Sequence, residues 1–158
     1  MKLRKGFTLV ELLIVIVIIG ILAAAMLLSS GSATAAAEAS NIVSDLRSMK
    51  AAALMFLADS MDAAGLTAAI TASDVGLLVP YMDNPSKFTN GAYNFEVVST
   101  VGATSWWVSY SLSVGNKTAT VAEKLATRAA SVGIYNTTQA DTSVLFTKTD
   151  KTAYMIAR

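Results

Sequence analysis

The fold is decided by an apolar stretch near the N-terminus. Residues 7–28 read FTLVELLIVIVIIGILAAAMLL, in which Thr8 and Glu11 are the only polar side chains. A helix of these 22 residues covers about 33 Å, which matches a bilayer hydrocarbon thickness of about 30 Å. Lys2, Arg4 and Lys5 precede the stretch, and such positive charges keep a short N-terminus in the cytoplasm. The sequence therefore predicts one membrane span, with the rest of the chain exported.

The stretch differs from an ordinary secretory signal peptide. The apolar core of such a peptide has roughly 7 to 15 residues and is followed by small residues at the cleavage site. The core here is longer, although Ala23, Ala24 and Ala25 offer small residues for a cut. A secreted chain that loses this segment therefore stays open as an alternative.

Glu11 is the unusual residue of the predicted span. A carboxylate inside an apolar helix costs about 2.5 to 3.5 kcal/mol on insertion scales, so such residues usually mark a function. A protonated carboxyl close to the lipid headgroups is the simpler interpretation, since Glu11 lies near the start of the stretch. That interpretation gives no reason for a Glu at this position.

These N-terminal residues carry a resemblance to a known family. Residues 5–15 read KGFTLVELLIV and follow further basic residues. They resemble the class III leader and N-terminal helix of type IV pilins and type II secretion pseudopilins. The resemblance implies that a prepilin peptidase cuts between Gly6 and Phe7 and methylates the new N-terminus of Phe7. It also implies that the apolar helix is retained, and that Glu11 pairs with the Phe7 ammonium of another subunit during assembly.

One departure from the family concerns helix flexibility. Many members have a proline where this chain has Leu28, and their helix kinks or melts there. Gly20 and the stretch around Gly31 are the remaining candidates for flexibility, because Gly costs about 1 kcal/mol relative to Ala inside a helix and Ser competes for backbone hydrogen bonds. The sequence leaves open whether the helix melts.

The pattern after the apolar stretch predicts an amphipathic continuation of the helix. Apolar residues recur at helical spacing, and Gly65 is the expected stop. The chain then divides into a cleaved leader (residues 1–6), a transmembrane and filament-core helix (7–28), an amphipathic continuation (29–64) and a globular head (65–158). The expected apolar face is Ile42, Leu46, Met49, Ala53, Phe56 and Leu57, and the charged residues expected largely elsewhere are Glu38, Asp45, Arg47, Lys50 and Asp59.

The head combines strand and helix patterns. Residues 93–97 and 106–114 alternate with period two and are joined by a short turn, which predicts an antiparallel pair. This alternation places Trp106 in the core and Trp107 on the opposite face, where an exposed ring would be either a subunit contact or a chance surface residue. Ser73 and Asp74 are the expected caps of a short helix that ends at Leu78 or Val79. Residues 120–132 are expected to form a second helix, and residues 143–148 and 152–157 to form strands. The expected fold class is α+β, a long N-terminal helix packed against an antiparallel sheet of about four strands.

Composition removes the commonest routes to hydrolysis and metal catalysis. The chain has no Cys and no His, which removes disulfides, thiolate and imidazole metal sites, and Ser-His and Cys-His nucleophile pairs. No metal site, cofactor or enzymatic activity is predicted. The net charge is +1, and no clustered basic footprint indicates a nucleic-acid binder, although net charge alone leaves a weak or tip-localised contact open.

The leading hypothesis is therefore a structural subunit of a type IV pilus. The precursor would lie in the inner membrane and then polymerise with itself into an extracellular filament on a bacterial surface. The resemblance implies three further partners: the prepilin peptidase, a platform protein of the inner membrane and a cytoplasmic ATPase. A major pilin is favoured over a minor pilin or a secretion pseudopilin. The alternative from another class is a membrane-tethered binding domain that never polymerises.

Overall fold

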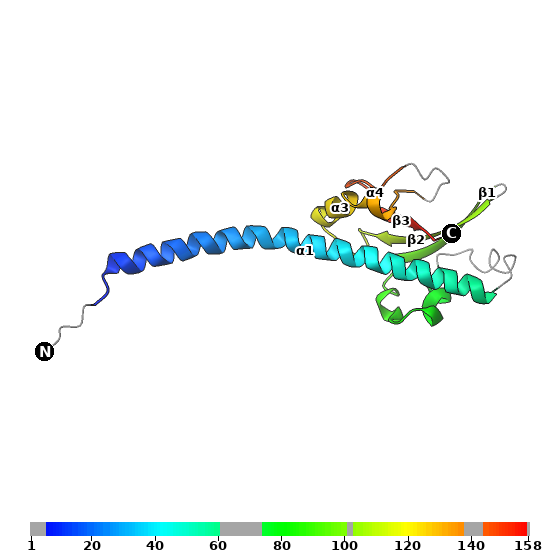
Figure 1. The fold of residues 1–158 in the computed structure, drawn as a ribbon, viewed down its shortest axis with the longest axis horizontal. Helices are drawn as coiled ribbons and strands as arrows, with labels where there is room; N and C mark the ends of the chain where they lie inside the picture. The colour runs from blue at the N-terminus through cyan, green and yellow to red at the C-terminus, as the bar shows by residue number, and fades with distance from the viewer. Residues whose placement is uncertain (1–5, 61–73, 101–102, 138–143, 158) are drawn as a thin grey trace. The chain divides into compact units, whose positions relative to one another are not determined.

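A computed structural model describes residues 6–60, 74–100, 103–137 and 144–157. The chain divides into two compact units, Met1–Thr34 and Ala35–Arg158, which are described separately. The elements, labelled in Figure 1, confirm the α+β fold class. They are α1 (Leu9–Ser60), the 3-10 helices η1 (Val75–Tyr81) and η2 (Pro85–Lys87), β1 (Tyr93–Thr100), β2 (Ala103–Ser111), α3 (Ala119–Ala126), α4 (Ala129–Val132) and β3 (Thr152–Ile156).

The sheet of the second unit has three antiparallel strands in the order β1-β2-β3. Phe95 pairs with Val108, and Val108 pairs with Met155, so the predicted alternating strands and the last strand are confirmed. The segment expected as a fourth strand contributes only an isolated bridge, between Leu145 and Tyr135. Tyr135 also bridges Tyr154, so residues 134–136 stand between that segment and β3.

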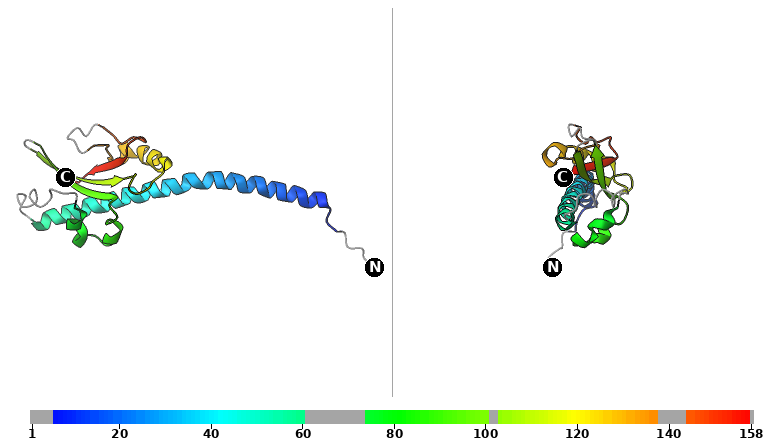
Figure 2. Two further views of the ribbon diagram at one scale, coloured as in Figure 1. Left: turned by 180° about the vertical axis from the view of Figure 1, so that it is seen from behind. Right: turned by 90° about the vertical axis from the view of Figure 1, so that its right-hand side faces the viewer.

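The core lies between the sheet and the second half of α1 (Figure 2). The predicted helix face is confirmed, because Ile42, Leu46, Met49 and Ala53 are buried against the same cluster as Phe95 and Trp106. Phe56 and Leu57 pack on its edge. The expected stop at Gly65 lies outside the described residues.

Shorter elements close the unit. The expected short helix is η1, which runs on to Tyr81, and the Asp74 side chain accepts a 2.7 Å hydrogen bond from the Gly76 amide. The other candidate cap, Ser73, lies outside the described residues. The helix expected over residues 120–132 is divided into α3 and α4 by a turn at Thr127 and Arg128. Gly133 ends α4 with φ 77°, a left-handed conformation that glycine adopts without a steric cost.

Trp107 is not exposed, contrary to the sequence-based expectation. Its ring points to the sheet face opposite Trp106, as the alternation predicts, but it is only 1% exposed. The Tyr135 ring packs edge-on against it with centroids 6.0 Å apart, and its Nε1 donates to Ser105 Oγ at 2.9 Å. Residues 134–137 thus add a layer over this face, and Trp107 cannot serve as a subunit contact.

Asp45 does not lie on the polar side of the helix, where the sequence pattern predicts it. The structure buries it, at 8% exposure. One carboxylate oxygen accepts from Lys87 Nζ at 2.6 Å and the other from the Tyr93 hydroxyl at 2.5 Å. Burial, followed by the hydrogen bond to Asp45, raises the pKa of the Tyr93 phenol. Asp45 therefore joins α1 to the η2 segment and to β1.

The Tyr93 phenol predicts a loss of stability at alkaline pH. Its folded-state pKa lies above its unfolded value, so the unfolded chain releases this proton first as the pH rises above about 10, and the free energy of unfolding falls there. Tyr93→Phe should show a shallower fall between about pH 9 and 11, with a remainder from Tyr110 and Tyr154, whose pKa values burial also raises. Urea unfolding followed by Trp fluorescence measures both slopes; equal slopes would contradict the prediction.

Candidate functional site

The first unit presents the predicted processing point outside the helix. Gly6, Phe7 and Thr8 precede the first residue of α1, Leu9. Gly6 is exposed and the Phe7 side chain is 90% exposed. A peptidase needs an extended, accessible backbone, and a bond inside a regular helix would have to be unwound first. The Gly6–Phe7 bond is thus in a position that a peptidase can reach.

Thr8 and Glu11 form a reciprocal cap at the start of α1. The Thr8 amide and hydroxyl each donate to Glu11 Oε2 at 2.8 Å, and the Glu11 amide donates to Thr8 Oγ1 at 3.2 Å. This is a capping box, in which a Thr and a Glu three residues later satisfy amides that have no partner within the helix. The sequence reasoning missed the role of Thr8, although the spacing T-x-x-E was a readable signal for it.

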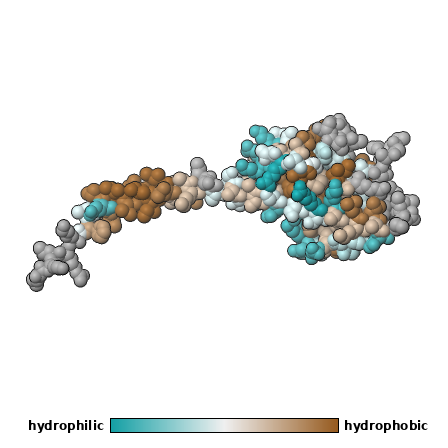
Figure 3. All heavy atoms as spheres, in the orientation of Figure 1, coloured by the Kyte–Doolittle hydropathy of each residue, from teal (hydrophilic) through white to brown (hydrophobic). Residues whose placement is uncertain are grey.

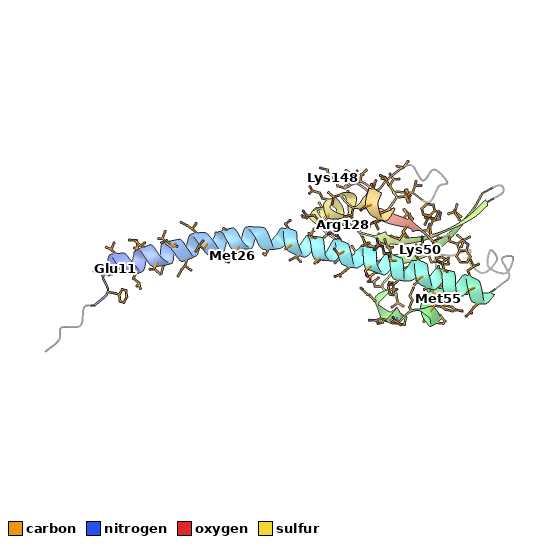
Figure 4. All side chains as sticks on the ribbon, in the orientation of Figure 1. Glu11, Met26, Lys50, Met55, Arg128 and Lys148 are labelled. Carbon is orange, nitrogen blue, oxygen red and sulfur yellow. The ribbon has the colours of Figure 1, made fainter. Side chains whose placement is uncertain are left out.

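In the isolated chain, the capping box accounts for the position of the Glu11 side chain. Both hydrogen-bond partners of its side chain belong to Thr8, one turn away. Figure 4 shows Glu11 at the first turn of α1, with Met26 farther along the same helix. Cleavage after Gly6 would leave this carboxylate four residues from a new N-terminal amine.

Apart from Glu11, residues 9–27 of this unit form an apolar cylinder. Every large apolar side chain between residues 9 and 27 is at least half exposed, and Figure 3 shows the apolar colour along this part of the helix. A helix that is apolar on all sides needs an apolar surrounding, either lipid or protein. Within the described residues α1 is the one helix long and apolar enough to cross a membrane.

The two candidate flexibility residues lie within a continuous helix. α1 runs through Gly20 and Gly31 without a break, and no heavy atom lies within 4 Å of a Cβ placed at either. Ser30 and Thr34 donate their hydroxyls to the carbonyls of Leu27 and Ser30. Such bonds weaken a helix slightly and often bend it. The predicted flexibility of this region stays a prediction.

The comparison with known families decides what this segment is. Residues 1–27 carry the prokaryotic N-terminal methylation motif. The motif indicates a precursor of the type IV pilin and pseudopilin kind, a class of structural proteins, and implies processing by a prepilin peptidase. Together with the apolar helix it fits a membrane-anchored precursor. The motif covers the N-terminal segment alone, and no curated protein and no solved structure matches the chain.

The described residues offer no second chemical site of comparable specificity. Among them no three His, Cys, Asp or Glu side chains are grouped to hold a metal ion. Asp45 is held by Lys87 and Tyr93, which is the arrangement of a structural ion pair.

Proposed function

We propose that the chain is the precursor of a type IV pilus subunit, most specifically a major pilin. The observation that carries this proposal is the all-round apolar helix whose one carboxylate, Glu11, lies four residues after the processing point. A simple membrane anchor needs the apolar surface, and it could use Glu11 only as a helix cap, a role that an uncharged Gln fills as well. A self-assembling helix uses both, because the surface becomes the filament core and the charge fixes how neighbours align.

The pairing partner of Glu11 is the Phe7 amine of a neighbouring subunit. Cleavage between Gly6 and Phe7 creates this amine, and N-methylation leaves it basic and positively charged. A buried charge pair is a poor source of net stability, but an unpaired buried charge is strongly destabilising. Only registers that bring Phe7 of one chain to Glu11 of the next avoid that cost, so the pair selects the helical register.

Assembly needs work from outside the subunit. In the precursor stage the helix already lies in lipid, so moving it into a filament core gains little from the hydrophobic effect. A cytoplasmic ATPase and an inner-membrane platform protein would supply the work of extraction. This accounts for an extracellular filament built from subunits that are stored in the inner membrane, with roles in adhesion, motility or DNA uptake.

The mature mass tests the processing step. Purified filaments should contain a chain that starts at Phe7, lacks residues 1–6 and carries one methyl group, about 14 Da. A Gly6→Leu precursor should keep its leader and its unmodified N-terminus, because a side chain at this position blocks access to the bond. Intact Met1 in the wild-type protein would support the tethered-domain alternative, and a cut near Ala25 would support a secreted protein.

Abundance separates the finer possibilities. Sheared surface filaments should contain this chain as their dominant protein, and a map of them by cryo-microscopy should place residues 7–28 at the filament centre. Trace amounts would point to a minor pilin. Dependence of assembly on a type II secretion system would point to a pseudopilin.

A further inference from the structure

Basic side chains gather at one end of the second unit. Lys117 Nζ lies 3.1 Å from Glu38 Oε2, and Arg128 donates to Ser40 Oγ. Glu38 and Ser40 belong to the first turns of the part of α1 that lies in this unit. The basic end is therefore the end at which the chain enters the unit.

Two further lysines extend this surface. Lys117, Lys148 and Lys151, here called the lysine cluster, line one cavity of about 200 Å³ beside the start of α3. Figure 4 labels Lys148 and Arg128 in this unit, and Figure 3 shows hydrophilic atoms gathered over the region of α3. This end of the unit is thus polar and open.

Charge at this end is not fully neutralised within the unit. Lys148 and Lys151 are exposed, and neither has an ion-pair partner among the residues the structure describes. The carboxylate between them, Asp150, accepts from the Thr147 amide and hydroxyl at 2.6 and 2.9 Å. Around this cavity and the first turns of this part of α1, the described cations outnumber the carboxylates; they are Lys117, Arg128, Lys148 and Lys151 against Glu38 and Asp150.

The length of the tether brings this end close to lipid. Residues 29–34 separate the expected span from the unit, and even fully extended they reach at most about 25 Å. In helical form the same residues cover roughly 10 Å. Whatever the orientation of the two units, the entry end of the second unit stays near the headgroups while the subunit is held in the membrane.

We propose that the lysine cluster binds anionic phospholipid headgroups and docks the unassembled subunit on the membrane surface. Each lysine near an anionic surface contributes roughly a fivefold change in the bound-to-free ratio. Docking would orient stored subunits, and assembly would release them as the helix leaves the bilayer. The inference rests on the membrane-held stage of the proposed function and does not require that filaments form.

The test uses the full-length precursor in vesicles. The chain has no Cys, so Ser113→Cys, at an exposed residue lining the same cavity, accepts a single fluorophore. A quencher attached to lipid headgroups reports whether this end touches the surface. Vesicles of phosphatidylcholine alone are compared with vesicles that also contain phosphatidylglycerol, and flotation verifies insertion in both.

The expected result is stronger quenching with phosphatidylglycerol, reduced to the neutral-lipid level by Lys148→Gln with Lys151→Gln. The matched control, Arg47→Gln with Lys50→Gln, removes the same charge from α1 outside the cluster and should keep the effect. Equal quenching in both lipids, or an equal loss in the control, would overturn the proposal. Quenching that follows protein density instead of lipid charge would assign the cluster to a contact between copies. Failure to float would overturn both this proposal and the membrane-held stage.

Discussion

Glu11→Gln is expected to reduce the yield of surface filaments by roughly tenfold or more, although the precursor is still made, inserted and processed. The amide removes the negative charge that is proposed to meet the Phe7 ammonium of the next subunit. Leaving one member of a buried pair without its partner costs about 3–5 kcal/mol, and about 1.4 kcal/mol already corresponds to a factor of ten. Immunoblots of sheared filaments from cells lacking the wild-type copy measure the yield.

The capping box makes the choice of variant important. Glu11→Ala removes both the charge and the hydrogen bonds to Thr8, so a loss of filaments in that variant would have two explanations. Gln is accepted at this position of a capping box, so Glu11→Gln keeps the local cap and removes only the charge. Comparing the two variants separates assembly register from helix capping.

Thr8→Ala provides the complementary control. It removes the hydroxyl that bonds Glu11 in both directions but keeps the carboxylate, and loss of such a cap costs about 1 kcal/mol. Filaments should therefore form with a modest reduction. If Glu11→Gln assembled normally while Thr8→Ala failed, the carboxylate would be a capping residue, and the proposed pairing with Phe7 would be wrong.

The N-terminal segment was readable from sequence because its information is local. Residues 7–28 are apolar at every position but two. A segment of this length and composition can be recognised as a membrane helix without any information from the rest of the chain. The motif around Gly6, Phe7 and Glu11 is likewise contiguous. The alternating strands could be predicted for the same reason, since period two is a property of neighbouring residues.

The errors arose where distant segments meet. Asp45 was placed on the polar face because charges normally face solvent, but its partners Lys87 and Tyr93 are 42 and 48 residues away. The alternation predicts an exposed Trp107 because a single helix covers only one face of the sheet. The other face is covered by Tyr135, and the residues around Trp107 in the sequence carry no signal of this contact. Residues 144–148 do not form the expected fourth strand, because residues 134–136 occupy the positions beside β3 at which that strand would pair.

Asp45→Ala is expected to lower the free energy of unfolding of the second unit by about 2–4 kcal/mol. The change leaves the Tyr93 hydroxyl, in a residue that is 5% exposed, without its acceptor. It also removes the acceptor of Lys87, whose side chain is 48% exposed and can return to water at little cost. Most of the loss should therefore come from the phenol and the cavity around it. Both Trp residues lie in β2, so urea unfolding of the full chain in detergent, followed by Trp fluorescence, reports on this unit.

A second carboxylate–tyrosine pair in the same unit supplies the matched control. Asp59 accepts from the Tyr81 hydroxyl at 2.8 Å, but at an exposed site, and Asp59→Ala should cost less than about 1 kcal/mol because water replaces the lost partner. Combining Asp45→Ala with Tyr93→Phe isolates the buried pair: once the phenol is gone, removing the carboxylate should cost clearly less than it does alone. Equal effects of Asp45→Ala and Asp59→Ala would show that burial contributes nothing to the Asp45 contacts. The attachment of η2 and β1 to α1 would then have to come from apolar packing around Phe88 and Phe95 alone.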